Sequence, residues 1–262
     1  MTEQIITFDD VEKLMRKVPK DVPLTFVGGQ ALGFWATVYY PRFKPQFDNR
    51  KDLDFTTFDI DIVASSANAE QCARAWEATI RKPEKWEETP NTAIVTVNIA
   101  GKGQVEIDFL DDYLKPSRIR KAFFSQVELS EDKPIYILGP FTVFLSKLAN
   151  TILLKRNSLA ERGQLLGSIL IVKCFLTEKI QQGELHTVYR HIDLLLHIAN
   201  NIRMGRGLYK KYNIDILTAI PDDLTALDER FLTHNYQQKL KKVLSHRNRH
   251  KRDLNSLNSL RP

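Results

Sequence analysis

Two short stretches in which acidic residues alternate with apolar ones constrain this chain more than any other feature. They read FDIDIV at 58–63 and VEIDF at 105–109. Successive side chains of a β-strand point to opposite faces of a sheet, so each stretch predicts a strand with one apolar face and one acidic face. Asp59 and Asp61 share the acidic face of the first strand. Glu106 and Asp108 share that of the second.

Paired carboxylates at this spacing are typical of sites for divalent cations. They raise each other's pKa unless a cation lies between them, and Mg²⁺ or Mn²⁺ prefers oxygen ligands. If the two strands are neighbours, one acid of the second joins Asp59 and Asp61, as two-metal phosphoryl chemistry requires. A strand with acids on its solvent face gives the same pattern without a metal, so both interpretations stay open. The nearby Asp52 and Asp54 follow polar residues and are expected in a solvated loop.

A pair of glycines follows the first apolar run of the chain. Residues 24–27 predict a strand, and Gly28 and Gly29 come directly after it, before an expected helix. Glycines allow backbone N–H groups to approach a phosphate closely, and a helix N-terminus favours anions. The pattern is neither GxGxxG nor GxxxxGK[ST], so no Rossmann or P-loop site is predicted. A simple turn is the alternative.

The combination of VGGQAL, TFDIDI and VEIDF, spread over residues 24–110, resembles the DNA polymerase β-type nucleotidyltransferase superfamily. Within it, the chain is similar to minimal bacterial nucleotidyltransferases that include abortive-infection toxins. The resemblance implies an α+β fold: a nucleotidyltransferase-like mixed β-sheet with flanking helices, then a helical C-terminal domain. It also implies catalytic and metal-binding roles for Asp59, Asp61 and Asp108, with Asp108 preferred to Glu106 as the third acid.

The same resemblance implies nucleotide-binding roles for Gly28, Gly29, Gln30 and Lys147. Gln30 stands where such proteins often have Ser or Thr, and the helical half has no Lys-Asp-x-x-Asp motif. In similar proteins a lysine placed like Lys147 reaches the nucleotide phosphates; a solvated surface lysine is the alternative.

Two further groups of candidate residues favour plainer interpretations. The basic stretch Lys115, Arg118, Arg120 and Lys121 faces either an anionic substrate or, the favoured interpretation, solvent. Three histidines in one expected helix do not share a face and are expected to be ordinary: His186, His191 and His197.

The expected elements divide the chain into a mixed half and a helical half. We expect helices over 8–18, 31–40 and 67–80, strands over 24–27, 58–64, 93–99, 104–110 and 122–129, and a loop over 42–54. After residue 139 only helices are expected, over 141–156, 159–178, 185–200 and about 233–244. The predicted parts are an α/β domain (1–139), a helical domain (140–236) and a basic tail (237–262) that frays after Leu244.

Charge and cysteine content bear on partners and location. Of the net charge of +6, residues 237–262 carry +7, residues 141–236 carry +3 and residues 1–140 carry −4. A nucleic-acid contact predicted from charge therefore belongs to the tail. Cys72 and Cys174 are expected to be free thiols in a reducing compartment. The most apolar stretch is too short to span a membrane, and no apolar leader is recognisable, so a cytoplasmic location is expected.

These observations predict a metal-dependent nucleotidyltransferase that moves a nucleoside monophosphate from an NTP to an acceptor, with Mg²⁺ or Mn²⁺ as cofactor. The acceptor is left open between tRNA or another nucleic acid, a protein and a small molecule. The resemblance adds a toxin-like role with a cognate antitoxin. The alternative is a catalytically silent module of the same fold that binds nucleic acid or a partner protein through its basic tail.

Overall fold

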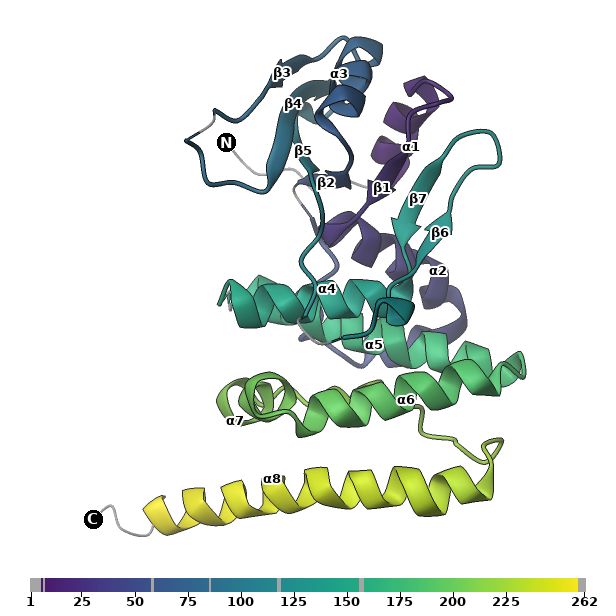
Figure 1. Ribbon diagram of the computed structural model, residues 1–262, viewed down its shortest axis with the longest axis vertical. Coiled ribbons are helices and arrows are strands. Elements are labelled where there is room, and N and C mark those ends of the chain that lie inside the picture. Colours follow the sequence, from purple (N-terminus) through teal and green to yellow (C-terminus); the bar gives the residue numbers. More distant parts are fainter. Residues whose placement is uncertain are drawn as a thin grey trace. The chain divides into compact units, whose positions relative to one another are not determined.

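The computed structural model describes residues 6, 8–57, 59–84, 86–116, 119–155 and 158–258 (Figure 1). It divides into two compact units, Met1–Ile171 and Val172–Pro262. The division falls inside a long helix, so the first helices after residue 139 group with the sheet. The change from mixed to helical structure near residue 139 and the division between units are therefore different boundaries.

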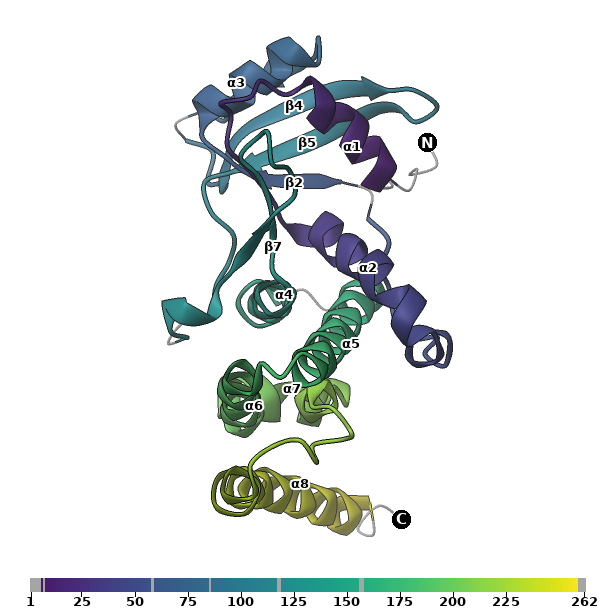
Figure 2. The same cartoon turned by 90° about the vertical axis from the view of Figure 1, so that its right-hand side faces the viewer.

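Within the described part of the first unit, seven strands form one mixed sheet in the order β3-β4-β5-β2-β1-β7-β6 (Figure 1). Figure 2 shows strands β4, β5, β2 and β7 of this sheet after a turn of 90°. Strands β1 and β7 are parallel, as are β2 and β5, and the other neighbours are antiparallel. The strands are β1 (Leu24–Phe26), β2 (Ile60–Val63), β3 (Thr79–Arg81), β4 (Asn91–Ile99), β5 (Gly103–Leu110), β6 (Gln126–Glu128) and β7 (Ile135–Leu138). The predicted α+β class, with a mixed sheet and a helical C-terminal region, is confirmed.

Helices accompany the sheet, and several begin or end where the sequence predicts. Asp9 and Asp10 lie in the first turn of α1, where they complement the helix dipole. Ser65 caps α3 by accepting a hydrogen bond from the Asn68 N–H. The helices of the first unit are α1 (Phe8–Lys17), α2 (Gly28–Asp48), α3 (Ser66–Ala75), the 3₁₀ turn η1 (Lys121–Phe123), α4 (Pro140–Leu153) and the start of α5 (Leu159–Gln181).

The core lies on the apolar face of β2 and β5, as the alternation predicts. Ile60, Ile62 and Ile107 are each at most 1% exposed. The buried indole of Trp76 packs against Phe109 and donates a hydrogen bond to the Leu14 carbonyl, which ties the end of α3 to α1. Because α1 and α3 cover this face, the acidic side chains of β2 and β5 lie on the opposite face of the sheet.

The predicted end of the second helix at Pro41 is wrong, and so is the loop predicted over residues 42–48. Helix α2 continues through two prolines to Asp48, with a kink at Phe43, whose φ is −122° and ψ 24°. Each interior proline costs a helix about 3 kcal/mol. Tyr39, Phe43 and Phe47 repeat at the helical spacing of four and are all buried. Burial of three aromatic rings offsets that cost.

Three other boundaries differ from the expectation. The helix predicted over 67–80 ends at Ala75, and residues 79–81 form edge strand β3 instead. The strand predicted over 122–129 shortens to β6, preceded by η1. Strand β7 was not expected, because its short run IYIL lacks any alternation with polar residues.

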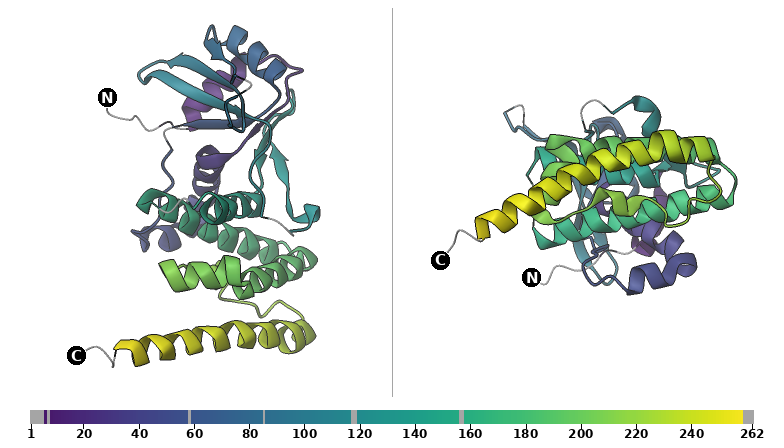
Figure 3. Two further views of the ribbon diagram at one scale, coloured as in Figure 1. Left: turned by 60° about the vertical axis from the view of Figure 1, so that its left-hand side comes forward. Right: turned by 90° about the horizontal axis from the view of Figure 1, so that it is seen from below.

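The second unit is helical, with the elements α6 (Leu185–Asn200), the π-helical turn η2 (Ile202–Arg206), α7 (Gly207–Tyr212), the 3₁₀ turn η3 (Ile216–Ala219), the π-helical turn η4 (Phe231–Tyr236) and α8 (Gln237–Asn258). Figure 3 shows α8 as one unbroken helix, so the predicted fraying after Leu244 is wrong up to Asn258. Contacts within the unit explain this result: Val243 is buried, and Arg247 pairs with Asp215 while lying 4.5 Å from the centre of the Tyr209 ring.

Two simpler expectations can be compared with the structure. Cys72 and Cys174 are both buried, and neither is part of a disulfide. Among the helices that the structure describes, none combines the length and apolar character needed to cross a bilayer.

Candidate functional site

The acidic face of the sheet brings two of the predicted carboxylates together. Asp61 on β2 and Asp108 on β5 are register partners in a parallel pair of neighbouring strands. Neighbouring strands lie about 4.8 Å apart, and register partners point to the same face. The condition set by the sequence, that the two alternating strands are neighbours, is therefore met.

Asp59 lies on the bend just before β2 and is exposed. The buried Thr57 hydroxyl donates a hydrogen bond of 2.8 Å to Asp59 Oδ1. The Gln30 side-chain amide donates a longer one, of 3.4 Å, to the Asp59 carbonyl. Gln30 thus contacts the backbone of the acidic segment. Phe58, which begins the predicted strand, lies outside the described residues.

The two glycines allow α2 to begin directly against the acidic residues. Gly28 has a φ of +60°, and a Cβ atom added to it would lie 1.9 Å from Asp61 Oδ2. A Cβ on Gly29 would lie 2.4 Å from the Thr57 hydroxyl oxygen. The Val27 N–H also donates to the Asp61 carbonyl, at 3.0 Å. A side chain at either glycine position would displace the groups that form the site.

The electrostatics of the site are those of crowded anions. Burial raises the pKa of the Asp108 carboxyl, and the charges of Asp59 and Glu106 raise it further. A hydrogen bond of 2.9 Å from the Asn91 amide to Asp108 Oδ1, and the charge of Arg81, lower it in part. A positive ligand bound at this face would therefore be stabilised.

The donor set fits a hard divalent cation, because carboxylate oxygens are the ligands that Mg²⁺ and Mn²⁺ prefer. Each carboxylate has its own neighbour, however: Thr57 for Asp59, Gly28 for Asp61 and Asn91 for Asp108. Within the described ranges, no three His, Cys, Asp or Glu residues are grouped so that they could hold a metal ion. The side chains therefore suit a cation in chemistry and are not converged on one point.

Lys147, on α4, is linked to the acidic segment through one intermediate side chain. Its ammonium group donates to Gln164 Oε1 at 2.7 Å, and Gln164 Nε2 donates to the Thr56 carbonyl at 3.0 Å. Thr56 is followed by Thr57, which holds Asp59. Sequence reasoning gave no role to Thr57, Asn91 or Gln164. Thr57 begins the TFDIDI stretch but was not assigned a contact, and no motif or spacing distinguishes Asn91 and Gln164 from other polar residues.

Two of the remaining candidates, Asp52 and Lys115, have local partners. Asp52 pairs with Arg50 at 2.7 Å in the expected loop. Lys115 pairs with Asp112 and lies 4.3 Å from the centre of the Tyr113 ring. Arg118 lies outside the described residues.

The histidine expectation concerns a helix of the second unit. His191 is half-buried, and its ring Nδ1 lies 2.6 Å from the Thr187 carbonyl oxygen in the preceding turn of α6. Burial lowers its pKa, which is the behaviour of a packed histidine.

Fold and site together define an α+β protein whose mixed sheet presents acidic side chains beside a helix that begins with two glycines. No protein-family model and no curated protein matches the chain. Among solved structures the chain is similar to the Megavirus polyadenylate synthase, with a TM-score of 0.38 and 10% sequence identity. The match covers 68% of this chain and 37% of that protein, so the chain spans well under half of its length.

Proposed function

We propose that the protein is a nucleotidyltransferase that moves a nucleoside monophosphate from an NTP to an acceptor hydroxyl. The observation that carries the proposal is the register of Asp61 with Asp108, with Gly28 in contact with the Asp61 carboxylate. This arrangement has two acids on one face of the sheet and the N-terminus of a helix beside one of them. Phosphoryl transfer needs this combination of anion binding and carboxylates.

The carboxylates of Asp59, Asp61 and Asp108 would hold Mg²⁺ or Mn²⁺. The bound cation would neutralise charge on the triphosphate and lower the pKa of the attacking hydroxyl. The first turn of α2, which starts at Gly28 and contains no acidic residue, offers its positive end to phosphate oxygens. Lys147 adds a positive charge when its hydrogen bond to Gln164 is exchanged for one to a phosphate.

The chemical step forms one bond and breaks one. The acceptor oxygen bonds to the α-phosphorus, the bond from that phosphorus to the bridging oxygen breaks, and pyrophosphate leaves. Asp108, the register partner of Asp61, accepts the hydroxyl proton as general base. The toxin-like role and the cognate antitoxin stay predictions from the sequence resemblance. The cytoplasmic location stays a prediction from the cysteines, the N-terminal residues and the apolar stretches of the sequence.

The test incubates the protein with each radiolabelled NTP, Mg²⁺ or Mn²⁺, and total cellular RNA and protein. Label in one fraction identifies both the nucleotide and the acceptor class. We expect Asp61→Asn and Asp108→Asn each to lower transfer by at least about 100-fold. Glu106→Gln is the matched control, because Glu106 is an exposed acid on the same face of β5. Equal losses in all three variants, or no loss in any, would contradict the assignment.

A second candidate function, binding of nucleic acid without turnover, is favoured by the charge of α8 and the residues after it. Residues 237–262 hold eight Lys or Arg and one acid. Removing this segment would also remove the buried Val243 and the Arg247–Asp215 pair, so truncation is a poor test. Replacing the exposed Lys241 and Lys242 by Gln leaves those contacts intact. Salt-dependent RNA affinity that falls in this variant, without NTP consumption by the wild type, would favour the second candidate.

A further inference from the structure

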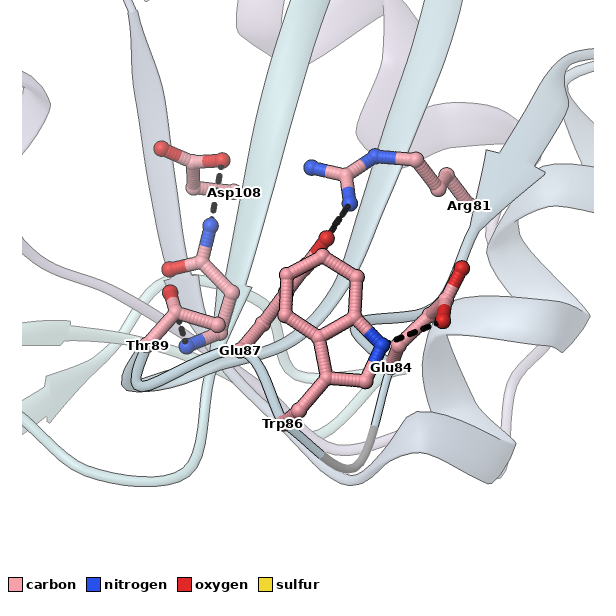
Figure 4. Close-up of polar contacts among 7 residues, drawn as sticks. Arg81, Glu84, Trp86, Glu87, Thr89 and Asp108 are labelled. Carbon is pink, nitrogen blue, oxygen red and sulfur yellow. Dashed lines mark hydrogen bonds and ion pairs between the residues drawn. The ribbon is translucent and has the colours of Figure 1, made fainter.

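The loop between β3 and β4 carries a tryptophan that is held in place and exposed. Trp86 is 73% exposed, and its indole N–H donates a hydrogen bond of 2.6 Å to the Glu84 carboxylate in the same loop (Figure 4). The two other tryptophans, Trp35 and Trp76, donate to main-chain carbonyls of distant segments and contribute to packing. Because its N–H is already bonded within the loop, Trp86 offers its ring face rather than a donor.

An arginine on the acidic face of the sheet is tied to the loop that carries this tryptophan. Arg81 is the register partner of Ile94, and Ile94 is the register partner of Asp108. Arg81 and Asp108 therefore point to the same face, two strands apart. The Arg81 guanidinium donates to both Glu87 carboxylate oxygens, at 3.0 and 3.1 Å, which ties the loop to β3.

The end of the loop is connected to the third carboxylate. The Thr89 hydroxyl accepts a hydrogen bond from the N–H of Asn91, the first residue of β4, and the Asn91 amide donates to Asp108. Figure 4 shows these contacts together with the Arg81–Glu87 pair and the Trp86 ring. A molecule bound to this loop is thus next to residues that contact Asp108.

The strand order separates two sides of the acidic site. Gly28 and the N-terminus of α2 follow β1, on the Asp61 side. Strands β4 and β3, with Arg81 and Trp86, lie on the Asp108 side. If the triphosphate occupies the glycine side, the acceptor approaches Asp108 from the side of β3 and β4.

We propose that the acceptor is the 3′ end of a single-stranded nucleic acid, with its terminal base stacked on Trp86 and a backbone phosphate on Arg81. This inference rests on the proposed function for the chemistry and names the acceptor. An aromatic ring suits any nucleobase, and a guanidinium suits a phosphate. A nucleotide offers both a base for the Trp86 ring and a phosphate for the Arg81 guanidinium, so the pair of side chains favours a nucleotide.

Binding is tested apart from transfer, with a short single-stranded oligoribonucleotide and no NTP. Tryptophan fluorescence of the wild type is expected to fall on binding, and the fall to disappear in Trp86→Phe, which keeps Trp35 and Trp76. In Trp86→Ala, affinity measured by anisotropy of a labelled oligonucleotide is expected to weaken roughly 5- to 150-fold, and in Trp86→Phe much less. Leu159→Ala, which removes an 85% exposed side chain outside the loop, is the matched control and is expected to bind like the wild type.

An oligonucleotide whose 3′-terminal nucleotide lacks its base separates stacking from phosphate contact. Its affinity for the wild type is expected to be as low as the affinity of the intact oligonucleotide for Trp86→Ala. Equal affinities of the wild type and Trp86→Ala would overturn the proposal. If a tyrosine-containing peptide quenches the tryptophan fluorescence and the oligonucleotide does not, the proposal is overturned in favour of a protein acceptor. Binding that depends on Trp86 without any transfer would support this surface and contradict the nucleotidyltransferase proposal. Transfer without oligonucleotide binding would support the nucleotidyltransferase proposal and contradict the binding surface at Trp86.

Discussion

Replacing Gly28 by alanine tests the contact between the start of α2 and the acidic site. The added Cβ would lie 1.9 Å from Asp61 Oδ2, whereas real contacts of this kind stay beyond 3.0 Å. The carboxylate oxygen therefore has to move by at least about 1.1 Å. Since a misplacement of about 1 Å in an active site can cost roughly 100-fold in rate, we expect kcat/KM for nucleotidyl transfer to fall by about that factor.

The same substitution also strains the backbone, and a matched control separates the two effects. Gly28 has a φ of +60°, and an alanine in this left-handed region costs about 1–2 kcal/mol. Gly101, in the turn between β4 and β5, has a φ of +78°, and a Cβ added there meets nothing within 4 Å. Gly101→Ala is therefore expected to lose a similar free energy of unfolding and to keep its activity.

Urea unfolding measures the stability of both variants, and transfer of label from a radioactive NTP measures their activity. We expect similar losses of stability and a difference of about 100-fold in kcat/KM. Similar activity of Gly28→Ala and Gly101→Ala would refute the inference that the position of the Asp61 carboxylate matters to the reaction.

Three further predictions concern the other acids of the site. Thr57→Val removes the hydroxyl that holds Asp59, so kcat should fall about tenfold or more while Thr57→Ser stays near the wild type in steady-state kinetics. Asn91→Leu removes a hydrogen bond that lowers the pKa of Asp108, so the acid limb of the pH–rate profile should move to higher pH; an unchanged profile would contradict the role of Asp108 as base. The folded state raises the pKa of Asp108 above its ordinary value of 3.8, so ionised Asp108 destabilises the fold and stability is gained as the pH falls through the raised pKa. Asp108→Asn should therefore be more stable than the wild type above the raised pKa, and urea unfolding at lower pH should show this advantage shrink.

The alternation of acidic and apolar residues predicted which side chains of β2 and β5 are buried. A period of two fixes which residues share a face, and β2 and β5 bury Ile60, Ile62, Ile107 and Phe109 as expected. Alternation within one strand says nothing about its neighbour, however. The pairing of β2 with β5 was a hypothesis until the register of Asp61 with Asp108 was seen.

Errors in the predicted elements came from tertiary contacts that override local signals. Pro41 is a strong local stop, but the aromatic residues after it, Phe43 and Phe47, carry α2 onward by being buried. The lack of apolar periodicity after Leu244 predicted fraying, but Arg247 continues α8 through its contacts with Asp215 and Tyr209. For α8 the stabilising partners are distant in sequence, so no local pattern could reveal them. For α2 the spacing of four between Tyr39, Phe43 and Phe47 was a local signal, and the interpretation of Pro41 as a stop outweighed it.

Two of the residues that sequence reasoning missed, Thr57 and Asn91, share one property: each acts through a carboxylate identified beforehand. Thr57 holds Asp59 and Asn91 holds Asp108 through single hydrogen bonds that any polar residue of suitable length could make. The acids themselves stand out because they interrupt apolar strands in a regular way. Burial and two neighbouring anions disfavour the ionised form of Asp108. A neutral side chain at this position would avoid that free-energy cost. Groups with such a perturbed pKa concentrate at functional sites. Because Asp108 lowers the stability of the fold, its presence is better explained by a role in the reaction than by a structural role.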